Sequence, residues 1–217
     1  MTRVCAIYGS ESGNSERRLK TLAKAWPDAK GVEFSKADIM SGDDAASKGL
    51  EALASTYDVI VIAASSYGDG DAPDNFVKFL TALYQAEGAP LKGCQHCVLG
   101  FGSTDYETFQ NNPRLTDKLM GELGSRRMLE RVEIDENETL AGDAALAKFA
   151  KNVVAAFADA AATKTAKDVC GWDQPADVIL DKKDELLAGG GASSSPLPLL
   201  VVALVGAAAA YYYSTLE

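Results

Sequence analysis

Histidine and basic residues are scarce in this chain of 217 residues. It holds one histidine, and its 21 Lys and Arg stand against 31 Asp and Glu, which gives a formal net charge of −10. Because the phosphates of nucleic acids attract basic surfaces, this balance argues against nucleic acid as a partner. An acidic surface suits a basic protein partner, or it only keeps the protein soluble, and charge alone leaves both interpretations open.

Cysteine is also sparse, with four residues in the chain. The four cysteines, in a chain without an N-terminal signal peptide, indicate a reducing compartment. Cys94-Gln95-His96-Cys97 has the spacing of a redox or metal motif, but no second pair of Cys or His completes a zinc site. Cys97 also begins an apolar run, where cysteine is an ordinary core residue. We therefore interpret both cysteines as structural and expect no metal.

The first glycine-rich loop lacks the lysine of a nucleoside-triphosphate loop. Residues 9–15 read Gly-Ser-Glu-Ser-Gly-Asn-Ser, whereas a triphosphate loop needs G-x-x-x-x-G-K-[ST]. The loop lies between an expected strand and an expected helix, and a helix N-terminus favours an anion through its free N–H groups and its dipole. We expect this loop to hold a monophosphate cofactor with hydroxyls and backbone alone.

Apolar runs and helical patterns alternate along the first 160 or so residues. The runs at 59–64 and 97–101 are continuously apolar, which is typical of parallel strands covered on both faces. The alternation predicts a doubly wound α/β domain over residues 1–162 with a five-stranded parallel sheet. The expected strands are Val4–Tyr8, Gly31–Phe34, Val59–Ala64, Cys97–Phe101 and Met128–Val132, and the expected helices are Ser15–Ala25, Asp43–Leu53, Asn75–Ala86, Pro113–Leu123 and Leu140–Ala161.

The end of the chain carries an uncharged run after a linker. The composition of 163–195 predicts a flexible linker, and 197–213 holds no charged residue. At about 1.5 Å per residue this run spans about 26 Å, close to a hydrocarbon core of about 30 Å. With three tyrosines as an interfacial belt, we interpret 196–214 as a single transmembrane helix that holds the domain on the cytosolic side. The alternatives are a buried helix and a lipid-anchor signal; the absence of basic residues after the run slightly favours the endoplasmic reticulum.

Two more loops follow the third and fourth expected strands, at 65–75 and 101–110. In a doubly wound sheet ligands bind beyond the carboxyl ends of the strands, so these loops should converge with the first one. Glycines beside Tyr67 allow the backbone to approach a flat ligand, and Tyr106 offers a second ring. Together the loops predict a planar heteroaromatic ring with a phosphate tail, held between the two tyrosines.

The three loops resemble those of the flavodoxins, and in particular the FMN domains of diflavin reductases. Ser10-x-Ser12-Gly13-Asn14-Ser15 is similar to the flavodoxin phosphate loop T-x-T-G-N-T. The second and third FMN loops resemble Ser66-Tyr67-Gly68-Asp69-Gly70-Asp71-x-x-Asp74-Asn75 and Gly102-x-x-x-Tyr106-Glu107-x-Phe109, and Leu123-Gly124-x-x-Arg127 is similar to the turn that follows. The resemblance covers about residues 3–157 and implies a flavodoxin-like fold with bound FMN.

The resemblance also implies roles for individual residues. The hydroxyls and backbone of 10–15 would hold the phosphate, Tyr67 and Tyr106 would flank the isoalloxazine ring, and the backbone of 67–69 would approach its N5 atom. Either Asp135 or Glu136 would be the acidic residue near the ring. The implied cofactor-binding residues are Ser10, Glu11, Ser12, Gly13, Asn14, Ser15, Ser65, Ser66, Tyr67, Gly68, Asp69, Phe101, Gly102, Ser103, Thr104, Asp105, Tyr106, Phe109, Gln110 and Glu136.

In function, the resemblance implies an FMN protein that relays single electrons, with no catalytic residue of its own, and the C-terminal run adds a tether at a membrane. An NAD(P)H-dependent reductase would be the donor and a haem or iron–sulfur protein the acceptor. Because the sequence lacks the FAD and NADPH domains of the diflavin reductases, we do not expect it to take hydride from NADPH. The alternatives are a flavodoxin-fold NAD(P)H quinone reductase and a membrane-anchored interaction module without redox use.

Overall fold

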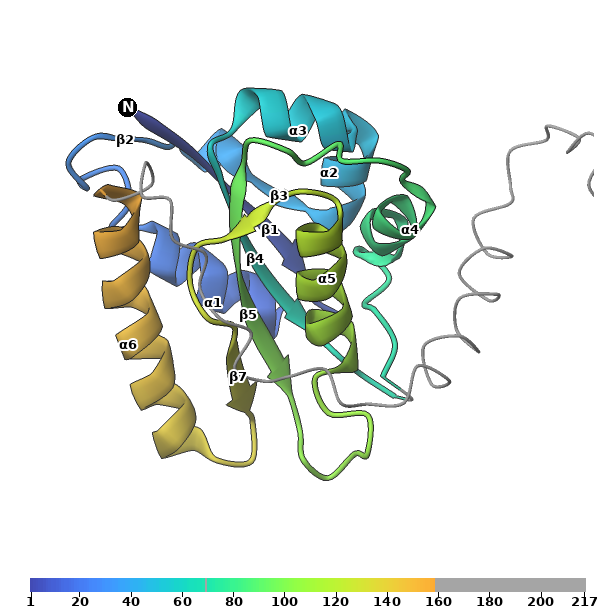
Figure 1. Ribbon diagram of the computed structural model, residues 1–217. Helices are drawn as coiled ribbons and strands as arrows, with labels where there is room; N and C mark the ends of the chain where they lie inside the picture. The colour runs from blue at the N-terminus through green and yellow to red at the C-terminus, as the bar shows by residue number, and fades with distance from the viewer. Residues whose placement is uncertain (69, 159–217) are drawn as a thin grey trace, which may run out of the picture.

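A parallel sheet forms the centre of the computed structural model, which describes residues 1–68 and 70–158 (Figure 1). The helices are α1 (Asn14–Ala23), the 3-10 helix η1 (Lys36–Asp38), α2 (Gly42–Lys48), α3 (Leu50–Thr56), α4 (Val77–Gln85), α5 (Asn111–Glu122) and α6 (Thr139–Ala158). The strands are β1 (Thr2–Gly9), β2 (Val32–Glu33), β3 (Ile39–Ser41), β4 (Val59–Ser65), β5 (Gln95–Gly102), β6 (Arg126–Arg127) and β7 (Val132–Asp135).

The sheet runs in the order β2-β1-β4-β5-β6, with β3 also paired to β1 and β7 to β5, all in parallel. The short strands β2 and β3 share one edge position and β6 and β7 share the other, so seven strands fill five positions. The predicted doubly wound α/β fold is therefore confirmed. The strand order reverses beside β1 and β4, which is where such folds bind ligands.

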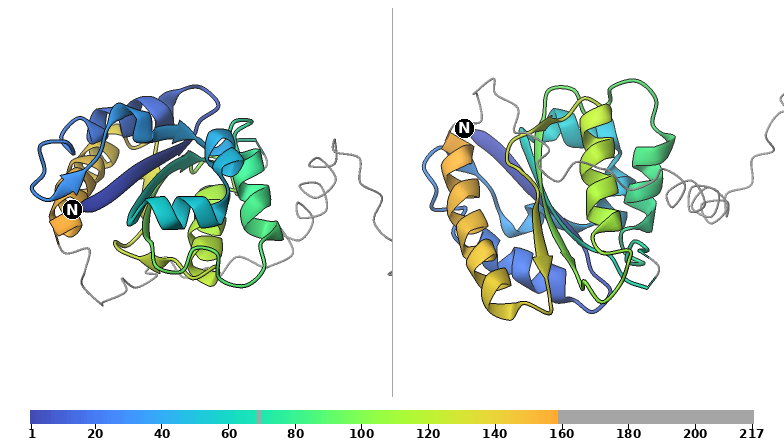
Figure 2. Two further views of the ribbon diagram at one scale, coloured as in Figure 1. Left: turned by 90° about the horizontal axis from the view of Figure 1, so that it is seen from above. Right: turned by 60° about the horizontal axis from the view of Figure 1, so that its bottom comes forward.

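Helices cover both faces of this sheet, and Figure 2 shows the resulting three layers. One core cluster packs residues of α1 and α6 on one face, including Leu19 and Phe149. The other cluster packs α2 to α5 on the opposite face, including Leu53 and Phe79. Burial on both faces explains why residues 59–64 of β4 and 97–101 of β5 are continuously apolar.

The helix expected over Asp43–Leu53 is two helices, because Gly49 has φ of 86° and interrupts it between α2 and α3. The Ser41 side chain accepts a hydrogen bond from Asp44 N–H, and the two residues form a capping box that starts α2 at Gly42.

The strand expected over Met128–Val132 is wrong, since the edge position is filled by β6 and β7 with 128–131 between them. The apolar residues Met128 and Leu129 are only partly buried, whereas Arg131 is buried and pairs with Asp117. A segment that buries a charged residue in an ion pair does not show the apolar pattern on which the prediction was based.

Two predictions on the C-terminal part, the linker 163–195 and the transmembrane helix 196–214, lie outside the described residues. Within residues 1–68 and 70–158, no helix combines the length and the apolar character that crossing a bilayer requires.

Candidate cofactor site

The first loop joins β1 to α1 and presents an open helix N-terminus. Gly13, the residue before α1, has φ of 79° and no side chain with which to cap the helix. The Ser10 hydroxyl accepts a hydrogen bond from Ser15 N–H at 3.1 Å, which closes the loop beneath this turn. Ser10 and Ser15 are buried, whereas Glu11 and Ser12 are exposed. The loop therefore offers N–H groups and the Ser12 hydroxyl to an anion.

The second loop follows β4 as a tight turn. Tyr67 and Asp71 exchange backbone hydrogen bonds of 3.3 and 2.9 Å across it. The turn needs the positive φ of Gly68 (52°) and Gly70 (87°), which residues with a Cβ adopt only under strain. Partial loss of water around the Tyr67 hydroxyl, followed by the nearby carboxylates of Glu11, Asp74 and Asp71, raises its pKa. The Tyr67 side chain is exposed at the surface, in a negatively charged environment.

The third loop follows β5 and is supported by the chain after β7. Glu136 N–H donates to Gly102 O at 2.8 Å, and Asn137 Nδ2 donates to the Ser103 hydroxyl at 2.9 Å. The Thr104 hydroxyl donates to Asp135, and this bond lowers the pKa of the Asp135 carboxyl.

The two acidic residues that the sequence left open thus have different places. Asp135 holds the third loop, whereas Glu136 lines the groove and accepts a hydrogen bond from Asn14 of the first loop.

A groove of 290 Å³ lies where the second and third loops meet. Tyr67 from the second loop and Tyr106 from the third are 41% and 58% exposed, unusually open for rings of their size. Strand register explains the meeting point, because Gly9 pairs with Ala64, Ser65 with Phe101 and Gly102 with Asp135 at one edge of the sheet. The groove is lined by Ser66, Tyr67, Gly68, Gly102, Ser103, Tyr106, Thr108, Phe109 and Glu136.

These features fit the FMN that the resemblance implies. The loop before α1 and the N-terminus of this helix supply N–H donors, which suits a phosphate monoester. The groove brings two open tyrosine rings to one place, which suits a planar ring system. A hydrogen bond from Asn14 to Glu136 connects the first loop to the groove.

Not every predicted residue turns its side chain to the groove. Phe101 is 1% exposed and its ring lies under the Arg18 guanidinium at 5.7 Å, on the core side of β5. Gln110 is fully buried with φ of 65°, and its Nε2 donates to Ile134 O at 3.2 Å. Both residues can act on a cofactor only through their backbone. Asp69 lies outside the described residues.

Three residues near the site are absent from the cofactor-binding residues that the resemblance implies. Thr108 lines the groove, and its hydroxyl donates to Gly68 O at 3.2 Å, which joins the second and third loops. Asn75 bonds to the first loop and Asn112 to the start of the second. Such contacts between distant segments leave no local pattern, although Asn75 belongs to the resembling motif.

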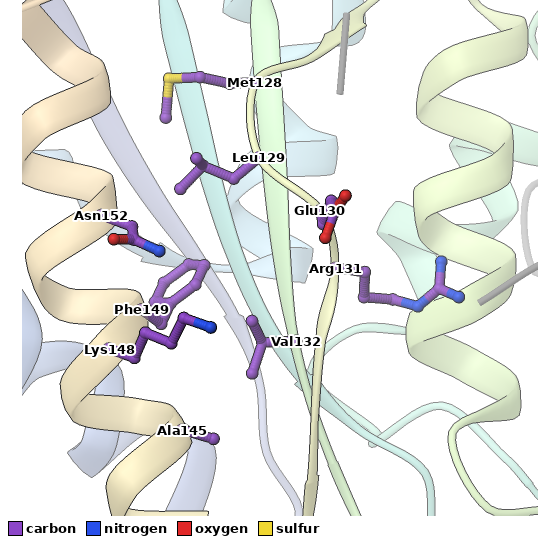
Figure 3. A pocket seen from close by; sticks show the side chains of 9 residues that line it. All are labelled: Met128, Leu129, Glu130, Arg131, Val132, Ala145, Lys148, Phe149 and Asn152. Carbon is purple, nitrogen blue, oxygen red and sulfur yellow. The ribbon is translucent and has the colours of Figure 1, made fainter. Parts of the chain in front are cut away.

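A second hollow, of 410 Å³, lies between α6 and the segment joining β6 to β7 (Figure 3). Figure 3 shows Arg131 pointing away from this hollow toward α5, where it meets Asp117. The hollow shares no lining residue with the groove, so it is not part of the cofactor site.

The Cys94 and Cys97 thiols are buried and unpaired, and burial raises the pKa of both. Cys97 lies within β5, and His96 lies between Ser125 and Asp117 at 2.8 and 3.0 Å. These residues thus belong to the core, in agreement with the structural interpretation of the cysteines.

Comparisons with known proteins agree with this geometry. A family model described as "Flavodoxin" matches residues 7–149. The chain is 30% identical over 138 residues to methionine synthase reductase from Caenorhabditis elegans, and the match covers 63% of this chain and 19% of that protein. It is 27% identical to "Probable flavodoxin 2" from Bacillus subtilis, where it covers 63% of this chain and 84% of the relative. The chain thus spans about a fifth of the reductase and most of the small relative.

Solved structures give the same fold. The crystal structure of oxidised flavodoxin 1 from Bacillus cereus superposes with a TM-score of 0.56 at 22% identity. The superposition covers 73% of this chain and 98% of that chain. At this identity the likeness concerns the arrangement of the strands and helices.

Proposed function

Since the chain belongs to the flavodoxin family, whose members bind FMN and transfer electrons, we propose that it relays single electrons between a reductase and an acceptor protein while held at a membrane. The groove between Tyr67 and Tyr106, with the open N-terminus of α1 nearby, is the observation that carries this proposal.

The residues of the chain bind and orient the cofactor. The N–H groups of 11–14 and the Ser12 hydroxyl would hold the FMN phosphate, and Tyr67 and Tyr106 would flank its ring. Bound FMN supplies the redox chemistry of the site. The protein contributes the geometry of the three loops and the exclusion of water from the faces of the ring by the tyrosines.

Carboxylates around the groove set the electrostatics of the site. Glu11 and Asp74 are linked through a hydrogen bond beside the first loop, and Glu136 lines the groove. Negative charges beside a bound cofactor oppose added negative charge on it, so they would lower its reduction potential. The same acidic surface would guide a basic redox partner to the exposed edge of the ring.

The partners proposed are an NAD(P)H-dependent reductase as donor and a haem or iron–sulfur protein as acceptor. Similarity to a methionine synthase reductase supports a place in a chain of redox proteins. The uncharged run 196–214 supports a tether at a membrane, for which we propose the endoplasmic reticulum with the domain in the cytosol.

The test of electron relay uses the full chain in detergent micelles, loaded with FMN and photoreduced without oxygen. Mixing with ferric cytochrome c, a basic haem protein, should reduce the haem in a stopped-flow experiment, at a rate that falls as NaCl is raised. NADPH alone should leave the flavin oxidised. Flavin reduction by NADPH with turnover of a quinone would instead identify a quinone reductase, and a chain that binds no FMN would identify a non-redox module.

The test of the tether compares the tagged full chain with a variant lacking 196–214 after cell fractionation. The full chain should sediment with membranes and resist a carbonate wash, while the shortened variant should remain in the supernatant. Both proteins in the supernatant would contradict the membrane proposal and leave the electron relay untouched.

A further inference from the structure

The end of the second loop runs beside the start of the first and pairs with it residue by residue. Asp74 N–H donates to Glu11 Oε2 at 3.1 Å. Asn75 pairs with Ser10, and the Phe76 ring lies against Gly9. Three consecutive residues of one loop thus support three consecutive residues of the other, within the described part of the chain.

Within this group, the side chain of Asn75 both accepts a hydrogen bond from the backbone of Ser10 and donates one to it. Its Oδ1 accepts from Ser10 N–H at 3.0 Å and its Nδ2 donates to Ser10 O at 3.2 Å. The side-chain amide therefore occupies both backbone groups of Ser10, as a neighbouring strand would, at the point where the chain leaves β1. This fixes the direction in which the chain enters the phosphate loop.

Ser10 carries this constraint to the helix. Its hydroxyl accepts from Ser15 N–H at 3.1 Å, and both serines are buried. The orientation of Ser10 therefore determines how the open first turn of α1 is presented. Displacing Ser10 would misplace the N–H groups meant for the phosphate and leave the tyrosine groove in place, because Asn75 does not line that groove.

We propose that Asn75 is the positioning residue for phosphate recognition, so that it determines the preference of the site for FMN over riboflavin, which has the same ring and no phosphate. The inference rests on FMN as the ligand of the site. Asn75 acts through Ser10 and needs no contact with the cofactor itself.

Asn112 provides a matched control within the same fold. Its Nδ2 donates to Ser65 O at 2.9 Å, and its N–H donates to the Ser66 hydroxyl at 2.8 Å. It therefore supports the start of the second loop, which lines the groove for the ring. Both asparagines hold a loop by a side-chain amide, one on the phosphate side and one on the ring side.

The experiment measures the Kd of flavin-free full chain for FMN and for riboflavin by quenching of flavin fluorescence. N75A should raise the Kd for FMN by about 5- to 150-fold, the equivalent of two neutral hydrogen bonds, and leave the Kd for riboflavin within about twofold. N112A should raise both constants by the same factor. An unchanged FMN-to-riboflavin ratio in N75A would overturn the proposal.

A second variant and a second readout cover the case in which N75A does not fold. N75D keeps the acceptor for Ser10 N–H and loses the donor to Ser10 O, and at 0.5 M NaCl its added charge is largely screened. It should lose part of the preference for FMN and retain riboflavin binding, and equal weakening of both would again overturn the proposal. Inorganic phosphate should raise the melting temperature of the flavin-free wild-type chain more than that of N75D, whereas equal rises would count against it.

These outcomes separate the inference from its premise. A wild-type chain that binds neither flavin removes the premise itself. A wild-type chain that prefers FMN, with N75A keeping the same preference, removes only the role of Asn75.

Discussion

Phe76 lies so close to Gly9 that a Cβ on Gly9 would come within 2.7 Å of its ring. The Gly9→Ala variant therefore has to displace a fully buried ring at the end of β1. We expect it to lose about 1–3 kcal/mol of stability and to bind FMN more weakly, because the phosphate loop starts at the next residue. Urea unfolding followed by circular dichroism measures the first effect, and a fluorescence titration with FMN measures the second.

Gly121→Ala is the matched control for this substitution. Gly121 lies in α5, and a Cβ there would meet nothing within 4 Å. Because glycine is unfavourable inside a helix, the variant should gain about 0.5–1 kcal/mol and keep its affinity for FMN. Similar losses in both variants would show that the contact with Phe76 is not the cause.

Removal of either exposed tyrosine should weaken FMN binding. Tyr67→Ala and Tyr106→Ala each take away one ring of the groove, and stacking on an aromatic side chain is worth about 1–3 kcal/mol in nucleic-acid systems. The Kd for FMN should rise about 5- to 150-fold, and the Kd for riboflavin should rise as much, since the ring is common to both. Cys94→Ala, before the amino end of β5, should leave both constants unchanged.

The buried carboxylate of Asp117 should prove essential for folding. It accepts hydrogen bonds from His96 Nε2 at 3.0 Å and Arg127 Nε at 2.9 Å, and it pairs with Arg131. Asp117→Ala leaves buried cationic partners without their anion, and we expect a loss of about 3–5 kcal/mol in urea unfolding. Glu122→Gln, which removes an exposed pair with Lys118, should stay within about 0.5 kcal/mol of the wild type. A small effect of Asp117→Ala would show that the network relaxes without it.

Acid should destabilise the fold by protonating two buried or half-buried carboxylates, Asp117 and Glu133. Burial alone would raise the pKa of both carboxyls. Hydrogen bonds from His96 and Arg127 lower the pKa of Asp117 below its ordinary value. Hydrogen bonds from Arg114 and Arg131 do the same for Glu133. A carboxyl whose folded-state pKa is lowered stabilises the fold above its unfolded pKa, about 3.9 for Asp and 4.3 for Glu, and loses this effect as the pH falls.

The Glu133→Gln variant isolates one of these groups. The stability gap between wild type and variant should be largest near pH 7 and should narrow as the pH falls from about 5 towards 3. Urea unfolding at several pH values measures the gap. A gap that stays constant with pH would mean that the charge of Glu133 contributes nothing.

The sequence predicts the parts of this fold whose signals are local. The strands β4 and β5 are recognisable because Val59–Ala64 and Cys97–Phe101 lie in continuously apolar runs, and the loops because glycines and hydroxyls interrupt the pattern. The edge strands β6 and β7 are not recognisable in this way, because they carry charged residues that form ion pairs, Arg127 with Asp117 and Glu133 with Arg114.

The support of the site by Asn75 and Asn112 is equally hidden, since each amide contacts backbone more than 40 residues away in the chain. The roles of Asp135 and Glu136 also needed the structure, because the two are neighbours in sequence and only hydrogen bonding separates them. The sequence therefore predicts where the site lies, and the structure shows how its loops are held.

The most direct test of the account is a titration of the flavin-free full chain with FMN and with riboflavin, in wild type and in a variant carrying both Tyr67→Ala and Tyr106→Ala. The account predicts that the wild type binds one FMN per chain with quenched flavin fluorescence and binds riboflavin more weakly. It predicts a large loss of affinity for both flavins in the double variant. A wild type that leaves the fluorescence of FMN unchanged, or a double variant that binds FMN as tightly as the wild type, would contradict it.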